Sequence, residues 1–184
     1  MKHELWKITA SKIVFEQEPW LRVISEDVEL PDGRIVKDYL RLEAPDFVMI
    51  VPVNTKDEIG LICSYKHGVR QIDIQPPAGY MDEGENPLAT AKRELLEETG
   101  SVSEHWQSLG SYVIAGNRGA GMAHFFLATE CIQVANPDSG DLEVQEVLWI
   151  PLVQVRQNWE EGSYAQLSTS AILGLAFARL QVGQ

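Results

Sequence analysis

Residues 79–101 are the segment that most constrains the fold and the chemistry of this chain. They read GYMDEGENPLATAKRELLEETGS, a glycine-bounded loop followed by a stretch with helix signals at both ends. Asn86 can cap a helix whose first residue is Pro87, and Gly100 stands where helices commonly end. Between these points apolar residues recur at roughly helical spacing, at Leu88, Ala91, Leu95 and Leu96. We therefore expect a helix over residues 87–99 with one apolar face.

Three glutamates gather on another face of this expected helix. At about 100° per residue, Glu94, Glu97 and Glu98 fall within an arc of about 100°. Ionised carboxylates this close repel one another unless cations lie among them. Mg²⁺ prefers hard oxygen ligands, and the sharp turn that Gly79 permits would let the Ala78 carbonyl reach the same ion. The pattern predicts a divalent-cation site for a phosphate substrate; the alternative is a solvated helix face held by ion pairs.

The charge balance and the cysteine content exclude several classes of protein. The chain has 184 residues, of which 15 are basic and 27 acidic, giving a net charge of −12. This argues against a nucleic-acid surface, which needs a basic patch, and bound cations would reconcile the acidity with an anionic substrate.

Cys63 and Cys131 lie in apolar segments, so we expect buried free thiols. Without a long apolar run or a signal-peptide core, a cytoplasmic location and no membrane partner are expected.

Segments rich in β-branched and aromatic residues predict strands along most of the chain. A turn signal at 31–33 makes residues 28–40 an expected hairpin. We expect residues 1–43 to form a small N-terminal β-sheet subdomain and residues 44–184 to form an α/β domain. Expected strands cover 13–15, 20–24, 35–40, 47–53, 59–64, 72–77, 110–115, 124–129 and 146–150, with further helices near 153–159 and over 168–180.

The glycine loop and the acidic helix together resemble a known family signature. Their pattern G-x5-E-x7-R-E-L-x-E-E-x-G resembles that of the Nudix hydrolases, which cleave nucleoside diphosphates linked to another group. The resemblance implies an α/β/α sandwich with a mixed sheet and a site for two or three Mg²⁺ ions, or Mn²⁺ in their place. It assigns metal-ligand roles to the Ala78 carbonyl, Glu94, Glu97 and Glu98, and structural roles within the motif to Glu85, Arg93 and Gly100.

The position of Arg93 allows two ion pairs. Helical spacing alone pairs it with Glu97, four residues on. The family resemblance instead implies that Arg93 bridges back to Glu85 and fixes the loop against the helix.

Features outside the motif narrow the resemblance to one branch of the family. The PDGR turn, PPAG, the AHFFLA strand and VLWIPL follow the order seen in ADP-ribose pyrophosphatases and related nucleoside-diphosphate-sugar hydrolases, over about residues 5–180. Such proteins are usually homodimers in which an N-terminal β-piece reaches across to the partner, so a homodimer is expected. A loop before the last core strand supplies their catalytic base, which matches Glu143 first and Asp141 second, with Glu97 as the helix candidate.

Substrate contacts are expected around the same loop. The resemblance and the residue chemistry assign them to Lys66, Arg70, Gln75, Gly79 and Arg118. Lys66 and Gln75 stand where the family often has Arg and Glu, and Lys lacks the planar fork of Arg. No proline lies near position 115, where relatives that prefer ADP-ribose often carry one. The base and the sugar of the substrate therefore stay open.

The sequence predicts a Mg²⁺-dependent pyrophosphatase of nucleoside diphosphate sugars. ADP-ribose, cleaved to AMP and ribose 5-phosphate, is the leading substrate, and another nucleotide sugar or a dinucleotide is the alternative. A different class of function is a binding module that senses such small nucleotides without cleaving them. The complete acidic set, and the lack of a DNA-binding domain beside it, favour the enzyme.

Overall fold

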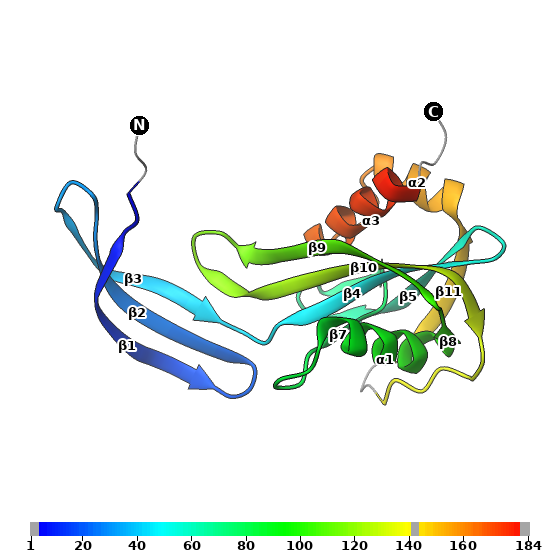
Figure 1. Cartoon of the computed structure of the whole chain (residues 1–184), viewed down its shortest axis with the longest axis horizontal. Coiled ribbons are helices and arrows are strands. Elements are labelled where there is room, and N and C mark those ends of the chain that lie inside the picture. The colour runs from blue at the N-terminus through cyan, green and yellow to red at the C-terminus, as the bar shows by residue number, and fades with distance from the viewer. Residues whose placement is uncertain (1–3, 141–143, 181–184) are drawn as a thin grey trace. The chain divides into compact units, whose positions relative to one another are not determined.

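The computed structural model describes residues 4–140 and 144–180, and the chain divides into two units. The first unit combines Met1–Asp46 with Tyr112–Ala123, and the second combines Phe47–Ser111 with His124–Gln184. Figure 1 draws the N-terminal strands of the first unit in shades of blue. The inclusion of residues 112–123 in the first unit has no counterpart in the sequence patterns, because it depends on contacts between distant parts of the chain.

Three antiparallel strands form the body of the first unit: β1 (Lys7–Gln17), β2 (Leu21–Glu29) and β3 (Ile35–Glu43). The predicted turn joins β2 to β3, and the amide of Gly33 donates to the carbonyl of Leu30. Arg22 on β2 donates to Glu16 on β1 and to Glu43 on β3, so charged side chains tie the three strands together. The strand β1 is exposed along its whole length.

A mixed sheet organises the second unit. Its strands are β4 (Phe47–Asn54), β5 (Glu58–Lys66), β6 (Gln71–Gln75), β7 (Ala78–Tyr80), β8 (Ser101–Val102), β9 (His105–Ala115), β10 (Gly119–Gln133) and β11 (Glu146–Pro151). The central order is β10–β4–β5–β11, with β6 beside β5, β7 beside β4, and β8 and β9 beside β10. The strands β9 and β10 continue into the first unit, where Gly119 pairs in parallel with Leu42 while most other pairs are antiparallel.

Helices cover both faces of this sheet (Figure 1). They are α1 (Pro87–Thr99) on one face, and α2 (Leu152–Glu160) and α3 (Leu167–Leu180) on the other. Val48 and Ile50 of β4 pack in one core cluster with Ala91 and Leu95 of α1. Because both faces of β4 are covered, its residues form a continuous apolar run. The predicted α/β/α sandwich is confirmed.

The opposite face of the sheet is filled by α2 and α3. Ile172 and Leu173 of α3 are fully buried, and Val155 of α2 is buried with them. Trp159 fixes the two helices to each other, since its indole N–H donates to the carbonyl of Ser170 at 2.8 Å and its ring meets Phe177 edge-on. This packing holds α3, whose first residues, near Leu167, form part of the wall of a cleft in the second unit.

Both cysteines are free thiols, as predicted, but only Cys131 is buried. Burial raises the pKa of its thiol to about 11. The expectation of burial is wrong for Cys63, which is half-buried on β5, opposite Glu146 at the start of β11. Within the described part of the chain, none of the helices combines the length and the apolar character needed to span a bilayer.

Candidate active site

A cleft of about 520 Å³ in the second unit collects the residues of the acidic motif. The four expected metal ligands, Ala78, Glu94, Glu97 and Glu98, all line it, together with Arg93. They come from two elements, the short strand β7 and the helix α1, so the cleft forms where the glycine loop meets the helix. Its other walls come from β4, β5, β6 and the start of α3.

Local signals fix the register of α1 and therefore the direction of its glutamates. The side chain of Asn86 accepts a hydrogen bond from the amide of Leu88, and Pro87 is the first helical residue. Gly100 ends the helix in the left-handed conformation, with φ of 67°, and its amide donates to the carbonyl of Leu96. The helix thus spans Pro87–Thr99, as predicted. Within it, Glu94 and Glu98 are buried among the lining residues of the cleft.

Gly79 leaves the space that the carboxylate of Glu94 occupies. A β-carbon added to Gly79 would lie 2.0 Å from the carboxyl carbon of Glu94, which is much shorter than the distance between two non-bonded carbon atoms in real structures. Close approach between this backbone and this side chain is therefore possible only with glycine at position 79. The requirement for glycine comes from packing against an acidic group that faces the cleft.

Glu98 is tied to the strand on the other side of the loop. The backbone amide of Ala78 donates to its carboxylate at 2.8 Å, and the side chain is buried. A hydrogen bond to an ionised acceptor is stronger than one between neutral groups. This bond holds a carboxylate of α1 in place at β7.

Arg93 links the loop to the helix through several acceptors at once. Its guanidinium donates to Glu85 at 3.3 Å, to Glu94 at 2.6 Å and to Glu97 at 2.9 Å. It also reaches the backbone carbonyl of Tyr80 at 3.3 Å. Both expected pairings therefore occur together, the bridge back to Glu85 and the helical pair with Glu97.

The electrostatics of this cluster follow from these bonds. Burial works against the charge of Arg93, but its hydrogen bonds to Glu85, Glu97 and Glu94 outweigh that cost and raise its pKa above the ordinary value. The hydrogen bond from Arg93 in turn lowers the pKa of Glu85. Arg93 and Glu85 are thus held in their charged forms, and the single guanidinium is shared among several carboxylates.

The donor set of the cleft fits a hard divalent cation. The charged side chains that line the cleft are three carboxylates, Glu94, Glu97 and Glu98, and two cations, Arg93 and Lys66, which leaves negative charge for a bound cation to neutralise. Across residues 4–140 and 144–180, no three His, Cys, Asp or Glu side chains form a ready-made metal cluster. Glu94 and Glu97 are both paired with Arg93. Mg²⁺ is usually held by one or two carboxylates plus waters and substrate phosphates, so a complete protein cage is not required.

The structure places the other predicted site residues in three different settings. Lys66, Gln75 and Gly79 line the cleft. Arg70 lies in the turn between β5 and β6 with φ of 57°, and its side chain is exposed. Arg118 belongs to the first unit, where its guanidinium donates to the carbonyl of Leu40 at 2.7 Å and stacks over the ring of Tyr39. Asp141 and Glu143 lie outside the described residues. The substrate-binding and base roles of all these residues stay predictions.

Several lining residues were not predicted from the sequence. Phe47, Met49, Ser139, Gln166 and Ser168 reach the cleft from segments that carry no motif. A local signal existed for one neighbouring feature: in QIDIQ the polar residues alternate with isoleucines, which places Asp73 and Gln75 on the same face of β6. The contribution of α3 had no such signal, because it depends on how the helix packs.

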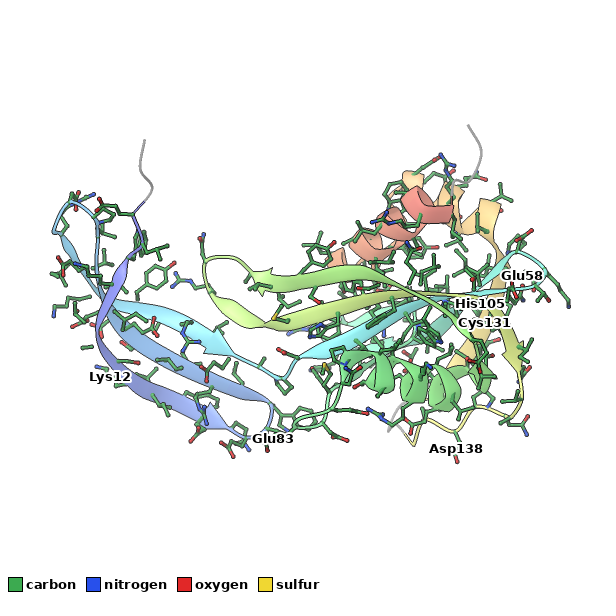
Figure 2. All side chains as sticks on the ribbon, viewed as in Figure 1. Lys12, Glu58, Glu83, His105, Cys131 and Asp138 are labelled. Carbon is green, nitrogen blue, oxygen red and sulfur yellow. The ribbon has the colours of Figure 1, made fainter. Side chains whose placement is uncertain are left out.

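The segment after β10 is anchored to the C-terminal end of α1. The amides of Val134 and Ala135 donate to the carbonyl of Gly100, and the amide of Asp138 donates to the carbonyl of Glu97 at 2.8 Å. Asp138 is labelled on this segment in Figure 2. The segment leads to Ser139 in the cleft wall, so the end of the acidic helix also positions the chain that follows.

Two family models match the chain. The model described as the NUDIX domain matches residues 44–168, and the one described as the nucleoside diphosphate sugar hydrolase N-terminal domain matches residues 6–39. The first contains the whole cleft, and the second contains β1 and β2 and part of β3.

Individual proteins show the same relationship. A CMP-5'-(N-acetyl-N-hydroxy-3-aminopropyl)phosphonate hydrolase of Streptomyces rubellomurinus is 29% identical over 182 residues, 97% of this chain and 87% of that protein. An ADP-ribose pyrophosphatase of Mycobacterium tuberculosis is 28% identical over 152 residues, 82% of this chain and 72% of that protein. A crystal structure of an ADP compounds hydrolase superposes with a TM-score of 0.85 at 22% identity, covering 98% of this chain and 97% of the other.

Proposed function

We propose that this chain, which belongs to the Nudix family and is a hydrolase that acts on pyrophosphate bonds, has a nucleoside diphosphate sugar as its substrate. ADP-ribose is the leading candidate for that substrate. The observation that carries this proposal is the single cleft in which Glu94, Glu97 and Glu98 meet the glycine loop. The match of residues 6–39 to the nucleoside diphosphate sugar hydrolase N-terminal domain supports a sugar nucleotide over a simple nucleoside triphosphate. The proposed products are AMP and ribose 5-phosphate.

The proposed reaction adds water across the P–O–P bridge. The oxygen of water forms a bond to one phosphorus, the bond from that phosphorus to the bridging oxygen breaks, and the bridging oxygen leaves with the other phosphate. One proton of the water passes to a general base within hydrogen-bond reach. The residues of the cleft bind and orient the diphosphate, and Phe47 and Met49 of β4 add apolar side chains to its wall.

A divalent cation fits this scheme as the partner of the acidic helix. Nudix hydrolases generally use divalent metal ions, and we propose Mg²⁺, held by Glu94, Glu98 and the Ala78 carbonyl with help from Glu97. When bound, such an ion supplies charge neutralisation for the diphosphate and lowers the pKa of a coordinated water. Arg93 holds Glu94 and Glu97 together through its hydrogen bonds to both carboxylates.

We propose Glu143 as the general base, with Asp141 second and Glu97 third. Glu97 lines the cleft, whereas the two loop acids follow the anchored segment that ends at Ser139. Replacing Glu143 by Gln should lower kcat by about two to four orders of magnitude if it takes the proton. A wild-type rate in Glu143→Gln would move the role to Asp141 or Glu97.

A second candidate substrate comes from the relative that covers most of the chain. That protein is named as a hydrolase of a CMP-linked phosphonate, and its similarity includes both units of this chain. The corresponding proposal is hydrolysis of a nucleotide joined to a phosphonate or another small group rather than to a sugar. It uses the same cleft and the same carboxylates.

We also propose that the protein is a homodimer that forms through the N-terminal strands of residues 1–43. The exposure of β1 along its whole length supports this, because Ile8, Ile13 and Phe15 are each at least half exposed on that strand. Light scattering coupled to size exclusion would report twice the mass of one chain. A monomer at micromolar concentration would contradict the dimer and leave the enzymatic proposal unaffected.

A substrate panel decides between the candidates. Purified protein with Mg²⁺ is incubated with ADP-ribose, ADP-glucose, GDP-mannose, UDP-glucose and a CMP-linked phosphonate, and the release of nucleoside monophosphate is measured. ADP-ribose should give the highest kcat/KM. A clear preference for the CMP compound would establish the second candidate, and product from none of the five would contradict both.

A further inference from the structure

The short strand β6 carries its polar residues inward and an apolar residue outward. Asp73 and Gln75 are only 6% and 7% exposed, whereas Ile72 is 63% exposed. This reverses the usual arrangement of a strand, because burying polar groups costs free energy unless their hydrogen bonds are satisfied. Such an inversion indicates that the buried polar side chains serve a purpose other than core packing.

Gln166 supplies the hydrogen bonds for both of these residues. It lies just before α3, and its side-chain Nε2 donates to Oδ2 of Asp73 at 3.0 Å and to Oε1 of Gln75 at 2.8 Å. These contacts span more than ninety positions of sequence and join α3 to β6. Gln75 and Gln166 both line the cleft.

The chemistry of the three groups determines which way each amide faces. A carboxylate only accepts hydrogen bonds, so Gln166 must present its NH₂ group to Asp73. The second hydrogen of that NH₂ group needs an acceptor, so Gln75 must present its carbonyl oxygen to Gln166. The NH₂ group of Gln75 then faces away from Gln166, and its two N–H donors are what this side chain can offer a ligand.

We propose that Gln166 is a positioning residue: anchored by Asp73, it holds Gln75 so that the NH₂ group of Gln75 donates to an acceptor atom of the nucleotide in the cleft. The proposal rests on the proposed function, because it takes the ligand to be a nucleotide. The acceptor is an uncharged oxygen or nitrogen of the nucleoside. A carboxylate at position 75 could only accept, so the same position would then select a donor instead.

The charge distribution in the cleft agrees with this assignment. The carboxylates of Glu94, Glu97 and Glu98 lie on α1, while Gln75 and Gln166 add uncharged hydrogen-bonding groups from β6 and from the start of α3. A diphosphate with its cations suits the acidic wall, and a neutral nucleoside suits the amides. Two kinds of wall in one cleft match the two chemical halves of a nucleotide.

The test combines kinetics with equilibrium binding. Gln166→Met keeps the length of the side chain and removes its hydrogen bonds, and Gln75→Met removes the proposed donor itself. Each should raise KM about tenfold, the effect of one hydrogen bond of about 1.4 kcal/mol, with kcat within about twofold. The double variant should be no worse than either single one, since both remove the same contact.

A matched control comes from α2. Gln154 is an exposed glutamine that donates to Asn158, so Gln154→Met removes a comparable hydrogen bond away from the cleft and should leave KM unchanged. If Gln166→Met does not fold, Gln75→Met carries the same prediction alone. An unchanged KM, equal losses in kcat and kcat/KM, or additive effects in the double variant would overturn the proposal.

Binding of product-like ligands separates this inference from the proposed function. Calorimetry with AMP and with ribose 5-phosphate needs no turnover. A loss of affinity in Gln166→Met for AMP but not for ribose 5-phosphate supports the positioning role, because only AMP carries the nucleoside. A loss of affinity for both ligands would contradict an acceptor on the nucleoside. If the wild type hydrolyses ADP-ribose but Gln166→Met binds both ligands as the wild type does, the inference fails while the function stands.

Discussion

The backbone amide of Ala78 donates a 2.8 Å hydrogen bond to the buried carboxylate of Glu98, and so joins the strand before the glycine loop to the acidic helix. In Glu98→Gln, the amide oxygen can still accept this bond, so the fold should survive. The negative charge available to a cation is lost. Because replacing even an indirect partner of a metal ligand costs about 10- to 100-fold in activity, losing a ligand should lower kcat by at least about a hundredfold. Thermal unfolding together with the initial rate on ADP-ribose tests this, and a near-normal kcat would refute the assignment of Glu98 as a ligand.

Gly79→Ala should disturb the same wall from the strand side. The new methyl would meet the carboxyl group of Glu94 at 2.0 Å, so one of the two must move. A displacement of about 1 Å in a catalytic group can cost about a hundredfold in rate. Gly116→Ala is the matched control, because a β-carbon there meets nothing within 4 Å. Equal kcat values for the two variants would show that Glu94 has no fixed position in the reaction.

The network around Arg93 should give stability that depends on pH. The hydrogen bond from Arg93 lowers the pKa of Glu85, so its contribution to stability is present above the ordinary glutamate value of about 4.3 and is lost as the pH falls through the lowered value. Arg93→Gln should therefore melt several degrees below the wild type at pH 7. That difference should shrink as the pH falls through the lowered pKa of Glu85, because its carboxylate is then protonated in both proteins. Melting curves across this range would contradict the account if the difference grew on acidification.

The glycine that ends α1 should be more sensitive to substitution than another glycine of similar backbone conformation. Gly100 and Gly84 both have positive φ, of 67° and 77°. A β-carbon at Gly100 would lie 2.1 Å from the carbonyl oxygen of Ala135, whereas at Gly84 it would meet nothing within 4 Å. Gly84→Ala should cost about 1–2 kcal/mol for the left-handed backbone alone. Gly100→Ala should cost about 1–3 kcal/mol more, because the anchored segment must shift; urea unfolding that gave equal losses would contradict this.

The limits of α1 could be predicted from the sequence because its signals are local. Asn86, Pro87 and Gly100 act within one turn of the helix ends, and the observed helix spans Pro87–Thr99 as expected. The acidic residues of the cleft followed from the same register. Around α1, helix propensity, capping residues and the spacing of apolar residues all indicate the same helix.

The extent of β9 and β10 could not be predicted in the same way. The strand β9 begins at His105 rather than near residue 110, and the positive φ of Gly110 interrupts the alternation that would have marked it. The glycines of residues 116–121 favour a flexible loop, yet β10 already begins at Gly119, because pairing with Leu42 of β3 stabilises it. The strands β7 and β8 are too short to show any period.

The contacts of Gln166 were the least predictable part of the site. Its partners Asp73 and Gln75 lie on β6, and only the packing of α3 brings the three together. No motif marks a glutamine for such a role. The alternation in QIDIQ shows that Asp73 and Gln75 share a face, but not that this face is the buried one.

The central claim is that the acidic cleft acts through a bound divalent cation. The most direct measurement is the initial rate of AMP release from ADP-ribose, first after chelation with EDTA and then with increasing Mg²⁺. We expect no release after chelation and a saturable return of activity with Mg²⁺, which Glu98→Gln does not show. A rate that EDTA leaves unchanged, or a rate of zero at every Mg²⁺ concentration, would contradict the account.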